Sequence, residues 1–229
     1  MSQILSSILT ALGGVLAGFA SAGALLWWQH QQLHDARQLA AQAEQRAERA
    51  HDLAHHDDTT GLPNRRAFNT RLAEALHAGA PTGVVLLDID DFKTVNDTYG
   101  HDLGNDLLTA VGMRLAELPP PVLLAARLSG DEFALIIDGG TDRTAACARA
   151  AWQAISARAV ALDPQLSIAL RVSVGHATAT TGITGRDLLH RADMAMYEAK
   201  HHGTGIAGTN GARRPPAGRR CRDLRTDHV

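Results

Sequence analysis

The sequence predicts a mixed α/β (α+β) domain that follows a membrane segment and a helical stalk. Two observations indicate this class: a continuous apolar strand at 84–90, and two apolar runs at 122–128 and 133–137 that are joined by a short turn. The segments around these strands have helical periodicity, so the predicted order is one helix followed by βαββαβα. With 229 residues, 45% of them hydrophobic, the chain suits one domain with a real core plus appendages.

Composition argues against several classes of protein. The net charge of −2 gives no general attraction to nucleic acid, so no nucleic-acid partner is expected. The two cysteines, Cys147 and Cys221, lie far apart, which argues against a disulfide framework and favours a reducing compartment. The 12 histidines are scattered, without an HExxH or a Cys/His metal pattern.

Residues 1–28 have the character of a transmembrane anchor. Ser2–His34 contains no Lys, Arg, Asp or Glu, and Ile4–Trp28 is long enough to cross a hydrocarbon core of about 30 Å. A cleaved signal peptide is the alternative, because Ala20-Ser21-Ala22 resembles a peptidase site, although a positively charged start is missing. Arginines follow the segment and none precedes it, which favours an inner (plasma) membrane anchor with the rest of the chain in the cytoplasm.

Residues 29–56 predict a helical stalk. Polar residues cover most of it, and alanines recur with 4,3,4,3,4 spacing at Ala36, Ala40, Ala43, Ala47, Ala50 and Ala54. This spacing is a coiled-coil seam, but alanine buries little area, so a single solvated helix is the alternative. Anchoring in one bilayer raises the effective concentration of two copies and favours a parallel pair. A homodimer is therefore expected.

The globular domain is expected at 57–207. Gly61, Pro63 and Asn64 break the stalk, and a helix with an apolar face begins after them. Further helices are predicted from about 101 to 118, from 141 to 160 and from 184 to 202, with a strand at 167–177 before the last helix. The remaining segment, 208–229, is rich in Gly, Pro and Arg. It predicts a disordered basic tail, with contact to anionic lipid as the alternative.

Three carboxylates stand out in this domain. Asp88 lies at the end of a buried strand, where a carboxylate is costly unless a divalent cation, a helix N-terminus or an arginine satisfies it. Asp131 and Glu132 are adjacent at the hairpin turn, which is placed at Ser129-Gly130. By themselves these two acids are more typical of a solvated hairpin tip than of a functional site, because short turn motifs match by accident.

The chain from about Asp57 to Gly205 resembles the GGDEF domain of diguanylate cyclases. Four stretches carry the resemblance in order: DDTTGLPNRRAF, LLDIDDFKTVNDTYGHDLGN, RLSGDEF, and SVGHATA followed by LLHRADMAMYEAKHHG. It implies a ferredoxin-like palm with a βαββαβ core and an antiparallel hairpin. It also implies that two GTP molecules, one on each subunit of a homodimer, condense into cyclic di-GMP and release two pyrophosphates, with two Mg²⁺ (or Mn²⁺) per active site.

The resemblance implies a role for each matching residue. The implied metal ligands are Asp88, Asp131, Glu132 and the carbonyl of Ile89. Asp131 or Glu132 is also implied to be catalytic, by deprotonating the 3′-hydroxyl. The implied substrate-binding residues are Phe92, Lys93 and Lys200 for phosphate and Asn96 and Asn105 for the base, together with His101 and Gly130.

Three positions depart from the family's pattern. Ser129 replaces the first signature glycine, Asn105 replaces an aspartate, and Thr204 replaces a phosphate-binding arginine. Because an amide offers one acceptor and one donor, Asn105 predicts weakened guanine selectivity and some mixed GMP–AMP product. A catalytically weak or inactive nucleotide-binding module is the other alternative. The family's product-inhibition motif Arg-x-x-Asp is replaced by uncharged residues 120–123, so product inhibition through that site is not expected.

Overall fold

The computed structural model describes residues 27–34, 37–42, 44–46, 54–163 and 166–209. Contacts divide the chain into two units, residues 1–52 and 53–229. In the first unit the described residues are helical, as predicted for the stalk. Four alanines of the predicted seam, Ala36, Ala43, Ala47 and Ala50, lie outside the described residues, so pairing of two stalks stays a prediction.

The membrane segment also stays a prediction. Of residues 1–28, only Trp27 and Trp28 belong to the described part of the chain. Within that part, none of the helices combines the length and the apolar character that a membrane span requires.

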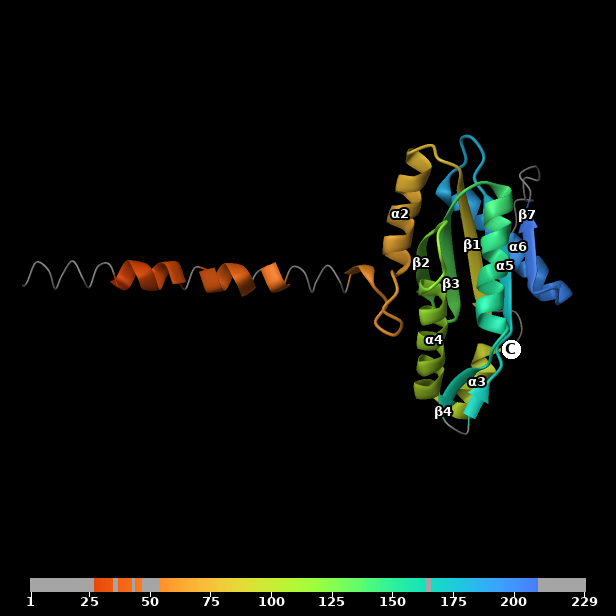
Figure 1. The fold of residues 1–229 in the computed structure, drawn as a ribbon, viewed down its shortest axis with the longest axis horizontal. Helices are drawn as coiled ribbons and strands as arrows, with labels where there is room; N and C mark the ends of the chain where they lie inside the picture. The colour runs from red at the N-terminus through yellow and green to blue at the C-terminus, as the bar shows by residue number, and fades with distance from the viewer. Residues whose placement is uncertain (1–26, 35–36, 43, 47–53, 164–165, 210–229) are drawn as a thin grey trace, which may run out of the picture. The chain divides into compact units, whose positions relative to one another are not determined.

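The second unit contains a five-stranded mixed sheet flanked by helices (Figure 1). Its elements in chain order are α2 (Arg65–His77), β1 (Thr82–Ile89), α3 (Phe92–Tyr99), α4 (His101–Ala116), β2 (Val122–Ser129), β3 (Glu132–Asp138), α5 (Thr141–Ser156), β4 (Val160–Asp163), β5 (Leu166–Ile168), β6 (Val172–Thr178), α6 (Gly185–His202) and β7 (Ile206–Thr209). The strand order is β2-β3-β1-β6-β7, and only the β6–β7 pair is parallel. The α/β class and the βαββαβ order of the core are confirmed.

Strand alternation divides the core into two layers. Val84 and Leu86 of β1 face a cluster that includes residues of α2 and α6. Val85 and Leu87 face the larger cluster, which includes residues of α4 and α5. Because successive side chains of a strand point to opposite faces, Asp88 belongs to the α2/α6 face with Val84 and Leu86.

Close contact between α6 and the sheet depends on one glycine. A β-carbon on Gly175 of β6 would collide with the main chain of α6 at Ala192 and Met196. At its start, α6 is capped by Thr184, whose hydroxyl accepts a hydrogen bond from the Asp187 N–H at 3.1 Å. These two features fix where the last turn of α6 lies, and this turn carries Lys200.

The structure corrects the predicted helix at 141–160. α5 ends at Ser156, and Val160 begins β4, which pairs with β5 in a separate two-stranded sheet. Arg114 of α4 stabilises this end, because its guanidinium donates to the carbonyls of Ala154, Ile155, Arg158 and Ala159. The periodicity of the sequence continued past this helix end and did not reveal it.

The predicted strand at 167–177 is also corrected. It is two strands, β5 and β6, that belong to different sheets and are separated by residues 169–171. Leu170 in the gap is buried in the main core, which is why apolar alternation ran through it. The carbonyl of Arg171 accepts a hydrogen bond from the N–H of Asp90 at 3.0 Å, so the gap supports the turn after β1.

Candidate active site

The end of β1 places two carboxylates side by side. Asp88 is paired in register with Glu132, the first residue of β3, so both side chains point to the α2/α6 face. Directly opposite residues on neighbouring strands have β-carbons about 4.5–5.5 Å apart. Asp88 is only 1% exposed. Two like charges this close are unfavourable unless cations neutralise them, which indicates a cation-binding site.

Each of these carboxylates has a basic neighbour from a helix. Lys200 at the end of α6 donates to Asp88 Oδ1 at 2.5 Å and lies 3.6 Å from Asp90 Oδ1. Arg65, the first residue of α2, places Nη2 3.6 Å from Glu132 Oε2. The two helices that cover this face of the sheet therefore each supply one positively charged side chain to the site.

The signature turn lies one residue later than predicted. Ser129 ends β2 and pairs with Glu132, so Gly130 and Asp131 form the turn. The positive φ of +47° belongs to Gly130, where glycine is the favoured residue. Ser129 is therefore compatible with the turn. Its hydroxyl donates to Glu132 Oε2 at 2.9 Å, which gives the serine a contact that glycine cannot make.

Arg127 connects the signature turn to the loop that precedes α2. Its Nε donates to the Gly130 carbonyl at 2.9 Å, and its Nη1 donates to Asp57 Oδ1 at 2.8 Å. Burial raises the pKa of the Asp57 carboxyl, but hydrogen bonds from Arg127 and Thr60 outweigh this effect, so the pKa lies below its ordinary value. The chain thus enters the domain through a charged contact with the turn.

The turn between β1 and α3 presents main-chain N–H groups. Asp91 adopts a left-handed backbone with φ +56°, and α3 begins at Phe92. The Phe92 ring is buried in the core, whereas Lys93 is exposed. The first N–H groups of a helix have no partner within the helix and favour anions, so this turn suits phosphate. Asp90 is held here by the Ser173 hydroxyl at 2.9 Å.

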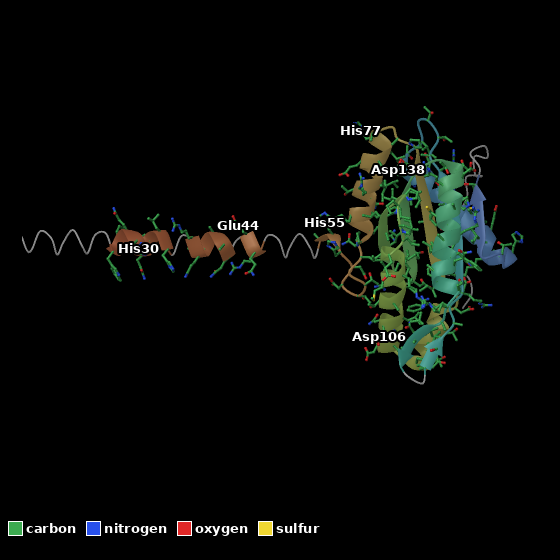
Figure 2. The ribbon with its side chains drawn as sticks, in the orientation of Figure 1. His30, Glu44, His55, His77, Asp106 and Asp138 are labelled. Atoms are coloured by element: carbon green, nitrogen blue, oxygen red, sulfur yellow. The ribbon has the colours of Figure 1, made fainter. Side chains whose placement is uncertain are left out.

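The candidate base-contacting residues lie on α3 and α4. A β-carbon on Gly104 would overlap the side-chain oxygen of Asn96, so Asn96 lies against the first turn of α4, at the residue that precedes Asn105 in the chain. Asn105 and His101 are both exposed on α4. Figure 2 shows Asp106, the neighbour of Asn105, at the α3 end of the domain and Asp138 at the opposite end.

Apart from Gly130 and Asp131, which form the turn, the predicted residues fall into two sets. Asp88, Glu132 and Lys200 are connected by register and by a hydrogen bond, and Ile89 joins them because its N–H donates to the Asp131 carbonyl at 3.2 Å. The other set contains Phe92, Lys93, Asn96, His101 and Asn105. Within the described residues, no three His, Cys, Asp or Glu side chains come together as a ready metal cage.

Sequence reasoning assigned no role to Arg65, Arg127 or Ser173. Arg65 of α2 donates to the Leu128 carbonyl and the Ser129 hydroxyl at the end of β2, and Arg127 of β2 donates to the Gly130 carbonyl in the turn. The available signal was their position inside two of the stretches that carry the family resemblance: Arg65 lies in DDTTGLPNRRAF and Arg127 begins RLSGDEF. Nothing local to Ser173 indicates its contact with Asp90.

Comparisons with known proteins agree with this geometry. The sequence model of the family described as diguanylate cyclase, GGDEF domain, matches residues 54–205. An uncharacterised signalling protein of Caulobacter vibrioides is 38% identical over 161 residues, which cover 67% of this chain and 20% of that protein. The diguanylate cyclase VdcA of Vibrio cholerae is 34% identical over 154 residues, which cover 64% of this chain and 44% of that protein. The chain therefore spans less than half the length of these relatives.

A solved structure shows the same fold. The coiled coil and GGDEF domain of DgcB from Caulobacter crescentus, in complex with c-di-GMP, has a TM-score of 0.70 at 29% sequence identity. The match covers 79% of this chain and 98% of that one. The family match covers more than half of this chain. The chain belongs to the GGDEF domain family of diguanylate cyclases.

Proposed function

We propose that this chain is a diguanylate cyclase, which condenses two GTP molecules into cyclic di-GMP and releases two pyrophosphates across a homodimer. The observation that carries the proposal is the in-register pair of carboxylates, Asp88 and Glu132, with Lys200 in contact with one of them. A paired set of acids with an adjacent cation is what a nucleotidyl transfer site needs for charge neutralisation.

The donor set fits Mg²⁺ or Mn²⁺. Asp88, Asp131, Glu132 and the Ile89 carbonyl are hard oxygen donors of the type that these ions prefer. Mg²⁺ is usually held by one or two carboxylates plus substrate phosphates, and this agrees with a site in which the described residues build no full cage of side chains. Two such ions, when bound, would neutralise phosphate charge and increase the acidity of the attacking 3′-hydroxyl.

The chain's own residues bind and orient the nucleotide. N–H groups at the start of α3 and the ammonium groups of Lys93 and Lys200 hold phosphate oxygens. A carboxylate of the turn, Asp131 or Glu132, accepts the proton of the 3′-hydroxyl. Gly130, which has no side chain, lets the substrate approach the main chain of the turn. Asn96, Asn105 and His101 contact the nucleoside from α3 and α4.

The direct test is turnover by the purified full chain. Wild type, Asp131→Ala and the matched control Asp138→Ala are incubated with GTP and Mg²⁺, and products are separated by chromatography. Asp138 is exposed at the other end of β3, so its loss leaves the site unchanged. We expect cyclic di-GMP from wild type and Asp138→Ala and none from Asp131→Ala. Nucleotide binding without product from wild type would instead identify a binding module.

A second activity is favoured by the amide at Asn105. Guanine donates from both N1–H and N2–H, and an amide accepts only through its oxygen, whereas the adenine edge matches the amide's donor and acceptor. We expect some cyclic GMP–AMP from a mixture of GTP and ATP, and less of it from Asn105→Asp. Production of cyclic di-GMP alone by both proteins would contradict this selectivity.

The remaining proposals concern assembly and location. We propose that residues 1–28 anchor the chain in the inner membrane with the catalytic domain in the cytoplasm, and that residues 29–56 pair two copies. The apolar length of the first segment and the alanine spacing of the second support these proposals. Extraction of the full chain from membranes only by detergent, followed by crosslinking to a dimer, would test both.

A further inference from the structure

A short polar contact in the site joins its most buried acid to a lysine. Lys200 Nζ lies 2.5 Å from Asp88 Oδ1, and the side chains are 41% and 1% exposed. A buried carboxylate needs a compensating charge, and Lys200 provides one from the last turn of α6. The ammonium group is therefore part of what makes Asp88 tolerable at this position.

The same oxygen, Asp88 Oδ1, is also a suitable ligand for a divalent cation. A cation bound at Asp88 and the Lys200 ammonium group are both positive, so they compete for Oδ1 and repel each other at short distance. Phosphate oxygens offer Lys200 an alternative partner of greater negative charge, and its exposed side chain has a flexible stem that can turn toward them. Asp90, the second acid near Lys200, keeps its hydrogen bond from Ser173 if the lysine leaves.

We propose that Lys200 is an exchangeable counter-ion that makes cation binding depend on nucleotide. Without nucleotide it neutralises Asp88 and opposes a divalent cation there. Nucleotide phosphates draw Lys200 away, and the cation then takes its place at Asp88. The inference rests on the proposed function, because it assigns phosphate binding to Lys200.

The exchange has a thermodynamic consequence that can be measured. If nucleotide raises cation affinity by some factor, the cation must raise nucleotide affinity by the same factor. Removal of the lysine charge should weaken nucleotide binding but strengthen cation binding in the absence of nucleotide, by about tenfold in each case. A residue that only supports the fold would move both affinities in the same direction.

The experiment measures Mn²⁺ binding to the full chain from the electron paramagnetic resonance signal of free Mn²⁺. Each protein is titrated alone and with a GTP analogue whose α–β bridge is a methylene group. This bridge cannot be cleaved, so binding is measured without turnover. The variants are Lys200→Met, which removes the charge, and Lys200→Arg, which keeps it. The matched control is Arg186→Met, which removes an exposed positive charge at the start of the same helix. Thermal unfolding, with and without Mn²⁺, checks that each variant is folded.

For wild type, Lys200→Arg and Arg186→Met, we expect weak Mn²⁺ binding alone and clearly tighter binding with the analogue. For Lys200→Met we expect about tenfold tighter binding alone, a smaller further gain with the analogue than in wild type, and a larger rise of the melting temperature on Mn²⁺ addition. Equal or weaker Mn²⁺ binding by folded Lys200→Met would overturn the inference even if wild type makes cyclic di-GMP. The expected Mn²⁺ pattern without turnover by wild type would leave the inference standing and reject the cyclase proposal. Absence of Mn²⁺ binding by wild type in both conditions would reject both.

Discussion

Replacement of Asp57 by alanine should destabilise the domain although Asp57 lies outside the carboxylate pair. Its Oδ1 accepts from Arg127 Nη1 at 2.8 Å, and from the N–H and hydroxyl of Thr60 at 2.9 and 2.8 Å. The Arg127 side chain is 9% exposed and the Asp57 side chain 24%. Asp57→Ala would therefore leave a buried guanidinium group with one charged partner fewer.

The expected cost follows from this burial. Removal of one partner from a buried ion pair costs about 3–5 kcal/mol, and the partial exposure of Asp57 favours the lower end, about 3 kcal/mol. For a domain of this size the melting temperature should fall by roughly 6–12 °C. The substitution should also lower turnover, because Arg127 donates to the Gly130 carbonyl in the signature turn.

The assay is urea unfolding of wild type, Asp57→Ala, Arg127→Met and the double variant, with Asp138→Ala as the control for loss of an exposed acid. This double-mutant cycle should give a coupling free energy of about 1–3 kcal/mol between Asp57 and Arg127, since the effects of substituting two residues in contact do not add. A cost below about 1 kcal/mol for Asp57→Ala would mean that the pair behaves as a surface ion pair, which would refute the reasoning.

The pH dependence of the same pair has a definite sign. The pKa of Asp57 is lowered in the folded domain from the ordinary value of 3.8. Its contribution is therefore fully present above that value and is lost as the pH falls through the lower, folded pKa. The difference in unfolding free energy between wild type and Asp57→Asn should stay constant from neutral pH to about pH 5 and narrow below about pH 4. A difference that widens on acidification would contradict the assignment.

The remaining predictions concern the turn, the sheet and the product. Ser129→Gly should keep the turn but lower the free energy of unfolding by about 1 kcal/mol, because the hydrogen bond to Glu132 is lost. Gly130→Ala should lower the free energy of unfolding by about 1–2 kcal/mol because of its positive φ, and an unchanged free energy in urea unfolding would contradict this. Gly175→Ala should cost about 3 kcal/mol or more by overpacking, and an unchanged melting temperature would show that α6 can shift freely. Calorimetry should detect no saturable cyclic di-GMP complex that depends on residues 120–123; loss of such a complex in Leu123→Asp would disprove this.

Local patterns predicted the parts of the fold that depend on local physics. The apolar runs of β1 and β3 were predicted because a buried strand needs such runs, whatever its neighbours. The end of α5 and the gap before β6 were predicted wrongly. Hydrogen bonds from Arg114 fix the end of α5, and packing of Leu170 in the core fixes the gap before β6. Both depend on contacts between segments that are distant in the sequence. β7 was missed because its four residues form a strand only alongside β6.

The site shows the same division. The resemblance to a family identified the acids of the site, but the side chains that contact charged residues here depend on how distant segments pack. Lys200 and Asp88 are 112 residues apart, and Arg127 and Asp57 are 70 apart. No periodicity or spacing indicates such pairs. Likewise, only the backbone shows that the left-handed position of the turn is Gly130, so that Ser129 is tolerated.

Gly175 extends the site beyond the residues that touch a ligand. The main chain of α6 rests on β6 at this glycine, near Met196, one turn before Lys200. A larger residue there would lift the helix and carry the lysine away from Asp88, although every residue of the signature turn would be unchanged. When relatives are sorted into active and inactive cyclases by their sequences, a change at this interior position should count as heavily as a change in the signature itself.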